Sequence, residues 1–353
     1  MHTFDYREIK FHITNELLKT ISDIQERKGE QNLYLNTRAD TVAMLAEIAK
    51  IQSVESSNRI AGICTSDDRL KQLALDKTIP QNRNEREIAG YRNVLNTINE
   101  NYNYIPIKTS SILPLHKDLY SYGGNEYGGK YRTGGSVITQ QGGDVEEIIR
   151  FQPLQACAVS EAMEQACTSF NRAIEQQSAN PLLLIPVFIL DFLCVHPFND
   201  GNGRMSRLLT LLLLYRFGYN VGKYISIERI IEQTKQEYYA ALYKSSQGWH
   251  ENKNDYLPFV NYMLGVLLAA YREFNDRVQI WKKKPPTKPQ RIKELIKNTF
   301  GTITKSEIKE RCPDISEITI QRMLAELVES GKVTKIGGGR YTKYIWNSEG
   351  DNK

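Results

Sequence analysis

Two long apolar stretches dominate the hydrophobic pattern of this 353-residue chain: Pro181–Val195 and Leu208–Tyr215. Both are too long for ordinary strands and apolar on nearly every face, which is typical of helices buried in a globular core. A membrane hairpin is the alternative. Each stretch is shorter than the roughly 20 apolar residues of a spanning helix, and Asp191 would lie close to the lipid. The pattern therefore favours two core helices.

The segment between the two stretches, residues 196–207, reads HPFNDGNGRMSR. Its central part, 199–203, consists of residue types that tolerate positive φ, so the turn can be tight. The second helix would begin inside this turn, where unpaired backbone N–H groups and the helix dipole favour a bound anion. Because Gly201 and Gly203 lack side chains, phosphate oxygens could approach the backbone closely. The turn is a candidate phosphate site.

Four ionisable side chains of this segment suit chemistry on a triphosphate. His196 has an ordinary pKa near neutrality and could take a proton from a hydroxyl. Asp200 could hold Mg²⁺, which proteins commonly bind through one or two carboxylates together with substrate phosphates. Arg204 and Arg207, three residues apart, could grip the outer phosphates. The order of these groups predicts a nucleotide site beside a reacting hydroxyl.

Each feature taken alone has a more ordinary explanation. A histidine after a buried helix is usually structural, Asp-Gly and Asn-Gly form turns, and paired arginines usually face water. A calcium-binding EF-hand loop starting at Asp200 would need Glu at its twelfth position, where Leu211 stands. The chain contains neither a Gly-x-x-x-x-Gly-Lys-Ser/Thr loop nor a His-Glu-x-x-His helix. Only the combined spacing favours the nucleotide site.

The same segment resembles the Fic domain signature, His-x-Phe-x-(Asp/Glu)-Gly-Asn-Gly-Arg-x-x-Arg, at every defined position. This resemblance implies a mainly α-helical Fic core that transfers AMP from ATP to a Ser, Thr or Tyr hydroxyl of a protein, itself included, and releases pyrophosphate. It also implies that His196 is the base, that Asp200 binds Mg²⁺ and that Phe198 anchors the loop in the core. Transfer of UMP or phosphocholine also occurs in the family. The nucleotide-binding positions would be Gly201, Asn202, Gly203, Arg204, Met205, Ser206 and Arg207.

Two further segments are similar to parts of Fic proteins. Residues 129–138 have β-prone pieces around a Gly-Gly turn, so we expect a hairpin that acts as the family's flap and holds a target segment by its edge. Its docking residues would be Lys130, Tyr131, Arg132, Thr133 and Gly134. Downstream, Tyr239 would cover one face of the adenine, although aromatic pairs on helices more often belong to a core.

An upstream segment is similar to the family's inhibitory helix, which ends in (Ser/Thr)-x-x-x-Glu-(Gly/Asn). Residues 36–51 have helical spacing and lead into Ser57-Asn-Arg-Ile-Ala61-Gly62, where Ala61 stands in place of the glutamate. In the family that glutamate pairs with the second arginine of the motif. Glu55 is six positions earlier, about 9 Å along a helix axis, and cannot substitute. We therefore expect Arg207 to be free for the γ-phosphate and the enzyme to be deregulated.

Charge is concentrated near the C-terminus: residues 282–346 contain 15 Lys and Arg against 7 Asp and Glu, although the whole chain carries only +5. The Pro-rich stretch 282–290 reads as a linker. After it, three short helical patterns, one opened by a capping box at Thr304–Glu307, and a hairpin around three glycines resemble a winged helix. Its basic hairpin favours nucleic acid backbone, whereas its acidic third helix, 316–330, argues against base reading. Protein contacts or dimerisation therefore remain open beside DNA binding.

Four regions follow: an N-terminal helical region at 1–95, the catalytic core at 96–281, the linker at 282–290 and the winged helix at 291–347. The chain has no basic-then-apolar N-terminus, so we expect a cytoplasmic protein that makes no use of a membrane. A homodimer is compatible with the sequence. The alternative function is a DNA-binding regulator whose Fic core senses nucleotide.

Overall fold

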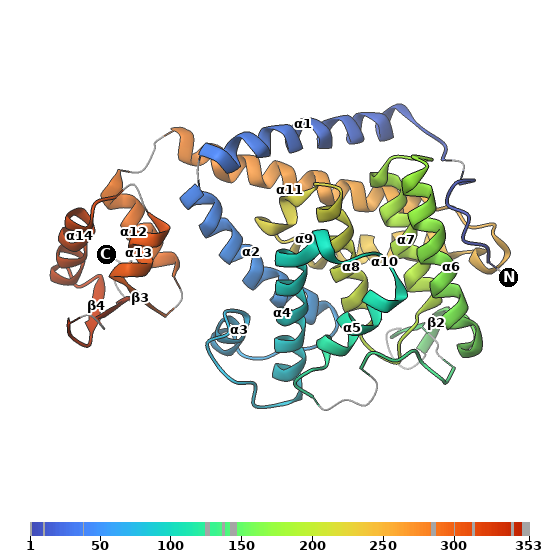
Figure 1. Ribbon diagram of the computed structural model, residues 1–353, viewed down its shortest axis with the longest axis horizontal. Coiled ribbons are helices and arrows are strands. Elements are labelled where there is room, and N and C mark those ends of the chain that lie inside the picture. Colours follow the sequence, from blue (N-terminus) through green and yellow to red (C-terminus); the bar gives the residue numbers. More distant parts are fainter. Residues whose placement is uncertain are drawn as a thin grey trace. The chain divides into compact units, whose positions relative to one another are not determined.

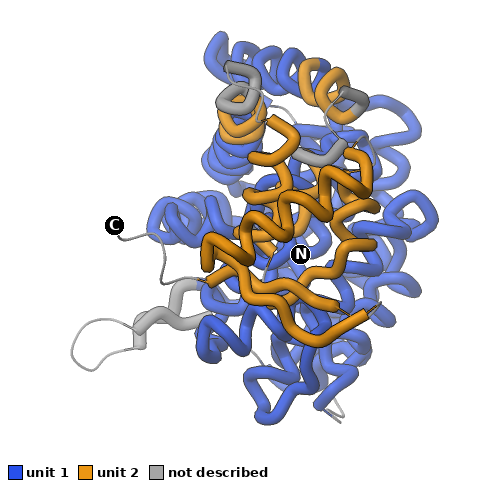
Figure 2. Tube along the Cα trace, turned by 90° about the vertical axis from the view of Figure 1, so that its left-hand side faces the viewer, with its two compact units in different colours: residues 1–29, 49–272 blue, residues 30–48, 273–353 orange. Residues whose placement is uncertain are grey.

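A computed structural model describes residues 2–9, 11–37, 39–123, 128–135, 138–141, 147–283, 287–299, 301–312, 315–339 and 342–347. The chain divides into two compact units (Figure 2). Unit 1 is Met1–Gly29 with Ala49–Arg272, and unit 2 is Glu30–Ile48 with Glu273–Lys353. Most of the predicted N-terminal region, 1–29 and 49–95, belongs to unit 1 together with most of the predicted catalytic core. The four regions stay a prediction.

Unit 1 is mainly α-helical (Figure 1). Three of its helices, α1, α2 and α11, continue into unit 2. The elements are α1 (Asn15–Thr37), α2 (Ala39–Ile60), α3 (Asp67–Ala74), α4 (Arg83–Asn101), η1 (Tyr102–Tyr104), α5 (Thr109–Leu119), β1 (Ile138–Gln141), β2 (Glu147–Phe151), α6 (Ala156–Glu175), α7 (Pro181–Val195), α8 (Asn202–Arg216), η3 (Asn220–Lys223), α9 (Ile227–Gln233), α10 (Lys235–Ser246), η4 (Trp249–Glu251) and α11 (Leu257–Lys283).

The two predicted core helices are confirmed as α7 and α8, which pack against each other. The side chains of α7 are almost all buried, including the carboxylate of Asp191. That carboxylate accepts hydrogen bonds from Tyr6 Oη at 2.8 Å, Trp249 Nε1 at 2.7 Å and Tyr256 Oη at 2.9 Å. A buried charge is tolerated only when it is hydrogen-bonded, so this acidic residue belongs to a protein core.

A close approach of α4 to α5 fixes one wall of the motif turn. At Gly90 on α4, an added Cβ would lie 2.0 Å from the carbonyl oxygen of Leu119, at the end of α5. Any larger residue would force the two helices apart. Because α5 leads directly into Tyr120 and α4 also packs against α8, this contact positions side chains that face the start of α8.

The hairpin lies later in the chain than the sequence predicted. β1 and β2 pair antiparallel, with Thr139 opposite Ile149 and Gln141 opposite Glu147, whereas residues 129–134 form no strand. The expectation of a hairpin over 129–138 was therefore wrong in position, because the strands lie at 138–141 and 147–151. The reason is that backbone N–H groups in 129–134 are already bonded elsewhere: Gly129 to a ring nitrogen of His116, and Arg132 to the carbonyl of Pro197.

Unit 2 contains the C-terminal elements α12 (Lys288–Asn298), β3 (Thr302–Thr304), α13 (Lys305–Arg311), α14 (Glu317–Glu329), β4 (Val333–Ile336) and β5 (Lys343–Trp346). The strands form an antiparallel sheet in the order β3-β5-β4. The predicted capping box is confirmed, since Thr304 and Glu307 bond reciprocally at the start of α13. These elements share one apolar core. The winged-helix assignment and any binding of DNA stay predictions.

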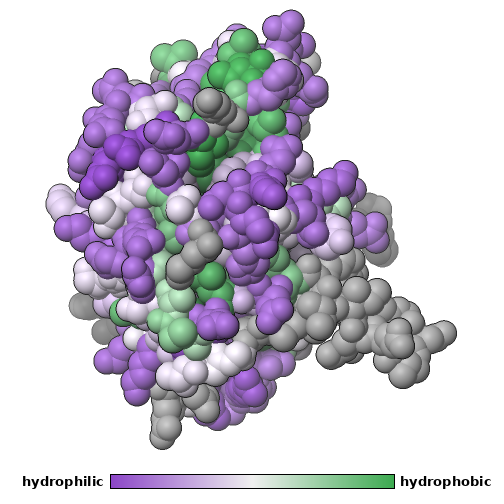
Figure 3. All heavy atoms as spheres, turned by 90° about the vertical axis from the view of Figure 1, so that its right-hand side faces the viewer, coloured by the Kyte–Doolittle hydropathy of each residue, from purple (hydrophilic) through white to green (hydrophobic). Residues whose placement is uncertain are grey.

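None of the helices in the described part of the chain combines the length and apolar character that crossing a bilayer requires. The face in Figure 3 carries mostly hydrophilic side chains, and its hydrophobic side chains gather in patches.

Candidate active site

The turn between α7 and α8 is built on two residues with left-handed backbone. His196, directly after α7, has φ 50° and ψ 62°, and Gly201, directly before α8, has φ 81°. At Gly201 a Cβ would also lie only 2.9 Å from the hydroxyl oxygen of Tyr120. A glycine at 201 adopts the left-handed backbone without strain and leaves room for the Tyr120 hydroxyl. His196, in contrast, holds a conformation that costs a non-glycine residue about 1 to 3 kcal/mol. The candidate base therefore occupies a strained position.

The side chain of Asn202 closes this turn from inside. Its Oδ1 accepts from the Phe198 N–H at 2.9 Å, and its Nδ2 donates to the Phe198 carbonyl at 2.8 Å. The same Nδ2 lies 3.4 Å from Nδ1 of His196. Phe198 is fully buried and stacks on His116 with 3.6 Å between ring centroids. Asn202 therefore shapes the loop, and Phe198 anchors it in the core as expected.

The surroundings of His196 favour its neutral form. Burial, followed by the positive charge of Arg132, lowers the pKa of the imidazole to about 4, although Asp200 acts in the opposite direction. An imidazole with this pKa is deprotonated throughout the neutral range, which is the form that accepts a proton.

Asp200 lies at the open side of the turn, with 56% of its side chain exposed. Burial opposes its ionisation, but the Arg204 charge and bonds from Tyr120 and the Gly201 N–H outweigh this and lower its pKa. Within the described residues, no group of three or more His, Cys, Asp or Glu could hold a metal by itself. A single ionised carboxylate suits Mg²⁺, which takes its other ligands from phosphates and water.

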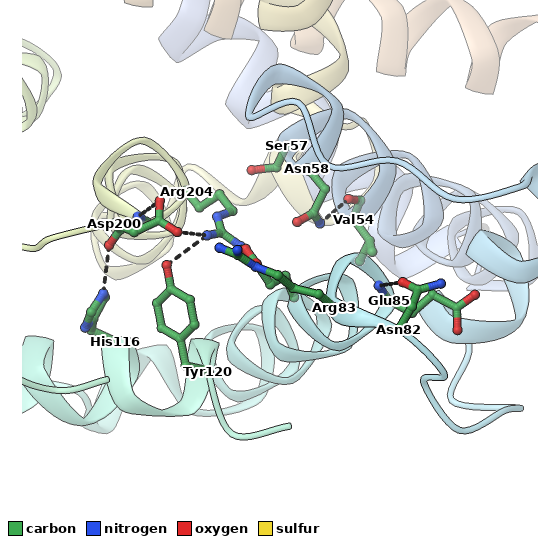
Figure 4. A network of polar contacts seen from close by, with 12 residues as sticks. Val54, Ser57, Asn58, Asn82, Arg83, Glu85, His116, Tyr120, Asp200 and Arg204 are labelled. Atoms are coloured by element: carbon green, nitrogen blue, oxygen red, sulfur yellow. Dashed lines mark hydrogen bonds and ion pairs between the residues drawn. The ribbon is translucent and has the colours of Figure 1, made fainter. Parts of the chain in front are cut away.

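Arg204, on the first turn of α8, is buried and already paired (Figure 4). Its Nη1 lies 2.8 Å from Oε2 of Glu87 on α4, and its Nη2 donates to Tyr120 Oη at 2.9 Å. The carboxylate of Asp200 is 3.5 Å from the same Nη2. Arg204 therefore joins α8 to α4 and to the residue after α5, and a phosphate would have to share it with these partners.

Arg207, one turn further along α8, contacts α2. Its Nε donates to Oγ of Ser57 and its Nη2 to the carbonyl oxygen of Ser57, both at 2.8 Å. The expectation that Arg207 is free was wrong, because sequence reasoning considered only carboxylate partners. Both acceptors are neutral, however, so the Arg207 charge is not cancelled by Ser57.

Among the described side chains of α2, no carboxylate pairs with Arg207. The helix ends at Ile60, and Ala61 and Gly62 follow as an exposed turn in which Gly62 has φ 77°. Glu55 pairs with Arg59 on its own helix. The described partner of Glu55 is therefore Arg59 and not Arg207, and the regulatory role of Ser57, Ala61 and Gly62 stays a prediction.

Comparison with known proteins identifies the domain that contains this turn. Residues 106–214 match the sequence model of the Fic/DOC family. These residues form a Fic domain. Their range extends from just before α5 into the last turn of α8, and so includes the whole segment 196–207.

Curated relatives are similar over part of this region. The protein adenylyltransferase fic-1 of Caenorhabditis elegans is 41% identical over 69 residues, which is 20% of this chain and 11% of the relative. The protein adenylyltransferase Fic of Drosophila melanogaster is 32% identical over 139 residues, 39% of this chain and 23% of the relative. The alignments thus span less than a quarter of either relative.

Solved structures support the fold. A Fic family protein from Desulfovibrio desulfuricans superposes with a TM-score of 0.58 at 21% identity, over 96% of this chain and 98% of that protein. A Fic domain containing signaling protein from Bacteroides thetaiotaomicron gives 0.59 at 20% identity, over 71% and 95%. At this identity the likeness concerns the fold alone.

In the Fic domain, the five predicted docking residues divide into two groups. Lys130, Thr133 and Gly134 are exposed. Tyr131 instead stacks on Phe198 with 5.9 Å between ring centroids, and Arg132 is buried against the carbonyls of the motif turn. The docking role stays a prediction for the exposed group, whereas Tyr131 and Arg132 face the motif turn.

The two neighbouring tyrosines on α10, Tyr238 and Tyr239, differ in burial. Tyr239, the predicted adenine contact, is 41% exposed. Its neighbour Tyr238 is buried, and burial raises its pKa to about 12 against the opposing effects of Arg207 and Ser206. The adenine contact of Tyr239 stays a prediction, and Tyr238 is the residue that lies beside the second arginine.

His116 is a site residue that sequence reasoning missed. Its Nδ1 accepts from the Gly129 N–H at 3.0 Å, so its Nε2 carries the proton and donates to the Asp200 carbonyl oxygen at 3.0 Å. Burial lowers its pKa to about 4. No local pattern marks it, because its partners lie 13 and 84 residues away in the chain.

Proposed function

We propose that this chain is a protein adenylyltransferase that uses ATP and Mg²⁺ to modify a Ser, Thr or Tyr hydroxyl, its own side chains included. The observation that carries the proposal is a neutral imidazole, His196, held in the same turn as the N-terminus of α8. The relatives from C. elegans and D. melanogaster that bear the name protein adenylyltransferase support it.

The proposed reaction assigns one step to each group. Nε2 or Nδ1 of His196 accepts the proton of the target hydroxyl, whose oxygen attacks the α-phosphorus of ATP. The bond from that phosphorus to the oxygen bridging to the β-phosphate breaks, and pyrophosphate leaves. Backbone N–H groups at the start of α8 stabilise the phosphate charge. Mg²⁺, held by Asp200, would neutralise charge on the departing phosphates.

The two arginines would contribute differently. Arg204 keeps its Glu87 and Tyr120 partners and adds positive charge behind the phosphates. Arg207 exchanges its bonds to Ser57 for bonds to the outer phosphate, and it gains by this exchange because charge-assisted hydrogen bonds are stronger than neutral ones. With Ala61 at the inhibitory position, no glutamate from that position opposes the exchange. The enzyme is therefore active without release of an inhibitory ion pair.

Transfer of label distinguishes this function from its alternatives. The wild-type chain is incubated with Mg²⁺ and ATP labelled either at the α- or at the γ-phosphate, and protein-bound label is measured. The expected result is label from the α-position alone and its loss in His196→Ala. A matched control is His12→Ala, an exposed histidine ahead of α1, which should label like wild type. Label from the γ-position, or full labelling by His196→Ala, contradicts the proposal.

A further inference from the structure

Arg132 is a buried cation whose described partners are all backbone carbonyls. Its side chain is 2% exposed. Nε donates to the His196 carbonyl at 2.8 Å, Nη1 to that of Gly134 at 3.0 Å, and Nη2 to those of Val195 at 3.3 Å and Leu154. Its own backbone N–H donates to the Pro197 carbonyl at 2.9 Å. Among the described side chains, no carboxylate pairs with it.

The Arg132 guanidinium lies at the C-terminal end of α7, and this position explains why its partners are carbonyl oxygens. The last carbonyls of a helix have no partner within the helix and carry the negative end of its dipole. Arg132 supplies donors to the carbonyls of Val195 and His196, at the end of α7, and adds a positive charge there. Burying a charge is costly unless it is hydrogen-bonded, and these carbonyls provide the bonds. Arg132 thus acts as a C-terminal cap of α7.

The capped residue is also the strained one. His196 has left-handed backbone, which persists only where surrounding contacts over-determine it. Arg132 bonds three successive carbonyls around that residue, two by its side chain and one by its backbone. A turn held at three consecutive peptide groups fixes the direction in which the Cα–Cβ bond of His196 leaves the backbone, and so the region from which the imidazole extends.

The remaining two bonds reach outside the turn. Gly134 precedes the β1–β2 hairpin and Leu154 follows it, so one guanidinium fastens both ends of the hairpin segment to the backbone that carries His196. From these contacts we infer that Arg132 is a positioning residue, which fixes His196 in its left-handed conformation and couples it to the base of the hairpin. The consequence for catalysis rests on the proposed function.

The test compares Arg132→Met, which removes the charge and all side-chain donors, with Arg132→Lys, which keeps the charge and up to three donors. Arg86→Met, at an exposed position of α4, is the matched control. We expect Arg132→Met to lower kcat for AMP transfer by about tenfold to a hundredfold, the cost of misplacing a catalytic group by about 1 Å. KM for ATP should stay close to wild type, because the phosphate site lies on α8. Arg132→Lys should recover part of kcat, and Arg86→Met should behave as wild type.

A second readout does not depend on activity. The chain contains five histidines, so the ¹³Cα signal of His196 can be assigned in histidine-labelled protein through its loss in His196→Ala. In Arg132→Met it should move toward the value of the unfolded chain, and less so in Arg132→Lys. Should wild type transfer no AMP, the proposed function fails while this measurement still decides the role of Arg132. An unmoved His196 signal in Arg132→Met overturns the inference, as does a parallel change of kcat and KM with loss of thermal stability. Should Arg132→Met not fold, an unmoved His196 signal in Arg132→Lys with unchanged kcat overturns it as well.

Discussion

Replacing His116 should make the stability of unit 1 less sensitive to acid. His116 is 1% exposed, and burial lowers its pKa from 6.5 to about 4. Between these values the unfolded chain binds a proton that the folded chain does not, so stability rises with pH in this window. The contribution is fully present above pH 6.5 and is lost as the pH falls toward 4. His116→Gln keeps one donor and one acceptor but cannot titrate.

The size of the effect follows from the shift. At 1.36 kcal/mol per pKa unit, the loss over the whole window is about 3 kcal/mol. Between pH 7 and pH 5 the same two pKa values give a loss of about 2 kcal/mol in the free energy of unfolding. Wild type should therefore lose about 2 kcal/mol more than His116→Gln on this change of pH, even if the substitution lowers stability at both values. His196 titrates in both proteins, so its contribution cancels in the comparison.

Urea unfolding followed by tryptophan fluorescence measures this difference. The chain has three tryptophans, and Trp281→Phe with Trp346→Phe leaves the fully buried Trp249 of unit 1 as the reporter. His12→Gln, at an exposed position, is the matched control and should show the wild-type difference between the two pH values. If wild type and His116→Gln lose equal stability between pH 7 and pH 5, the reasoning about burial of His116 is refuted.

Three predictions concern the proposed reaction. With a His196 pKa of about 4, kcat at pH 5.5 should stay close to its value at pH 7.5; a decline of about tenfold, as for an unshifted histidine base, would count against the site. Ala61→Glu introduces a carboxylate in the exposed turn that follows α2, the helix that carries Ser57, and should slow AMP transfer by about tenfold to a hundredfold if that carboxylate reaches Arg207, with Ala61→Gln as the neutral control; equal rates for both variants would exclude the ion pair. Ser57→Ala removes one neutral bond to Arg207 and should lower KM for ATP by about fivefold, whereas a raised KM would mean that Ser57 helps to bind ATP.

The sequence predicted the parts of the site that are contiguous in the chain. The residues 196–207 combine a helix end, a glycine turn and a helix start, and each of these has a local signal. The same holds for α7, α8 and the capping box of α13, because apolar periodicity and capping are properties of short segments.

What the sequence missed depends on contacts between distant segments. Ser57 and Arg207 are 150 positions apart, and Arg204 meets Tyr120 across 84. No local pattern could show that Ser57 would accept hydrogen bonds from Arg207, or that Glu87 would pair with Arg204. The hairpin was misplaced for the same reason: the backbone donors of Gly129 and Arg132 are used by His116 and the motif turn, and this becomes visible only once the chain is folded.

The central claim is that His196 initiates transfer of a whole adenylate, and the mass of the modified protein tests it most directly. Intact-mass spectrometry of the chain and of an added protein extract, after incubation with ATP and Mg²⁺, should show species heavier by one adenylate with wild type and none with His196→Ala. Species heavier by one phosphate, or adenylate addition that persists in His196→Ala, would contradict the account.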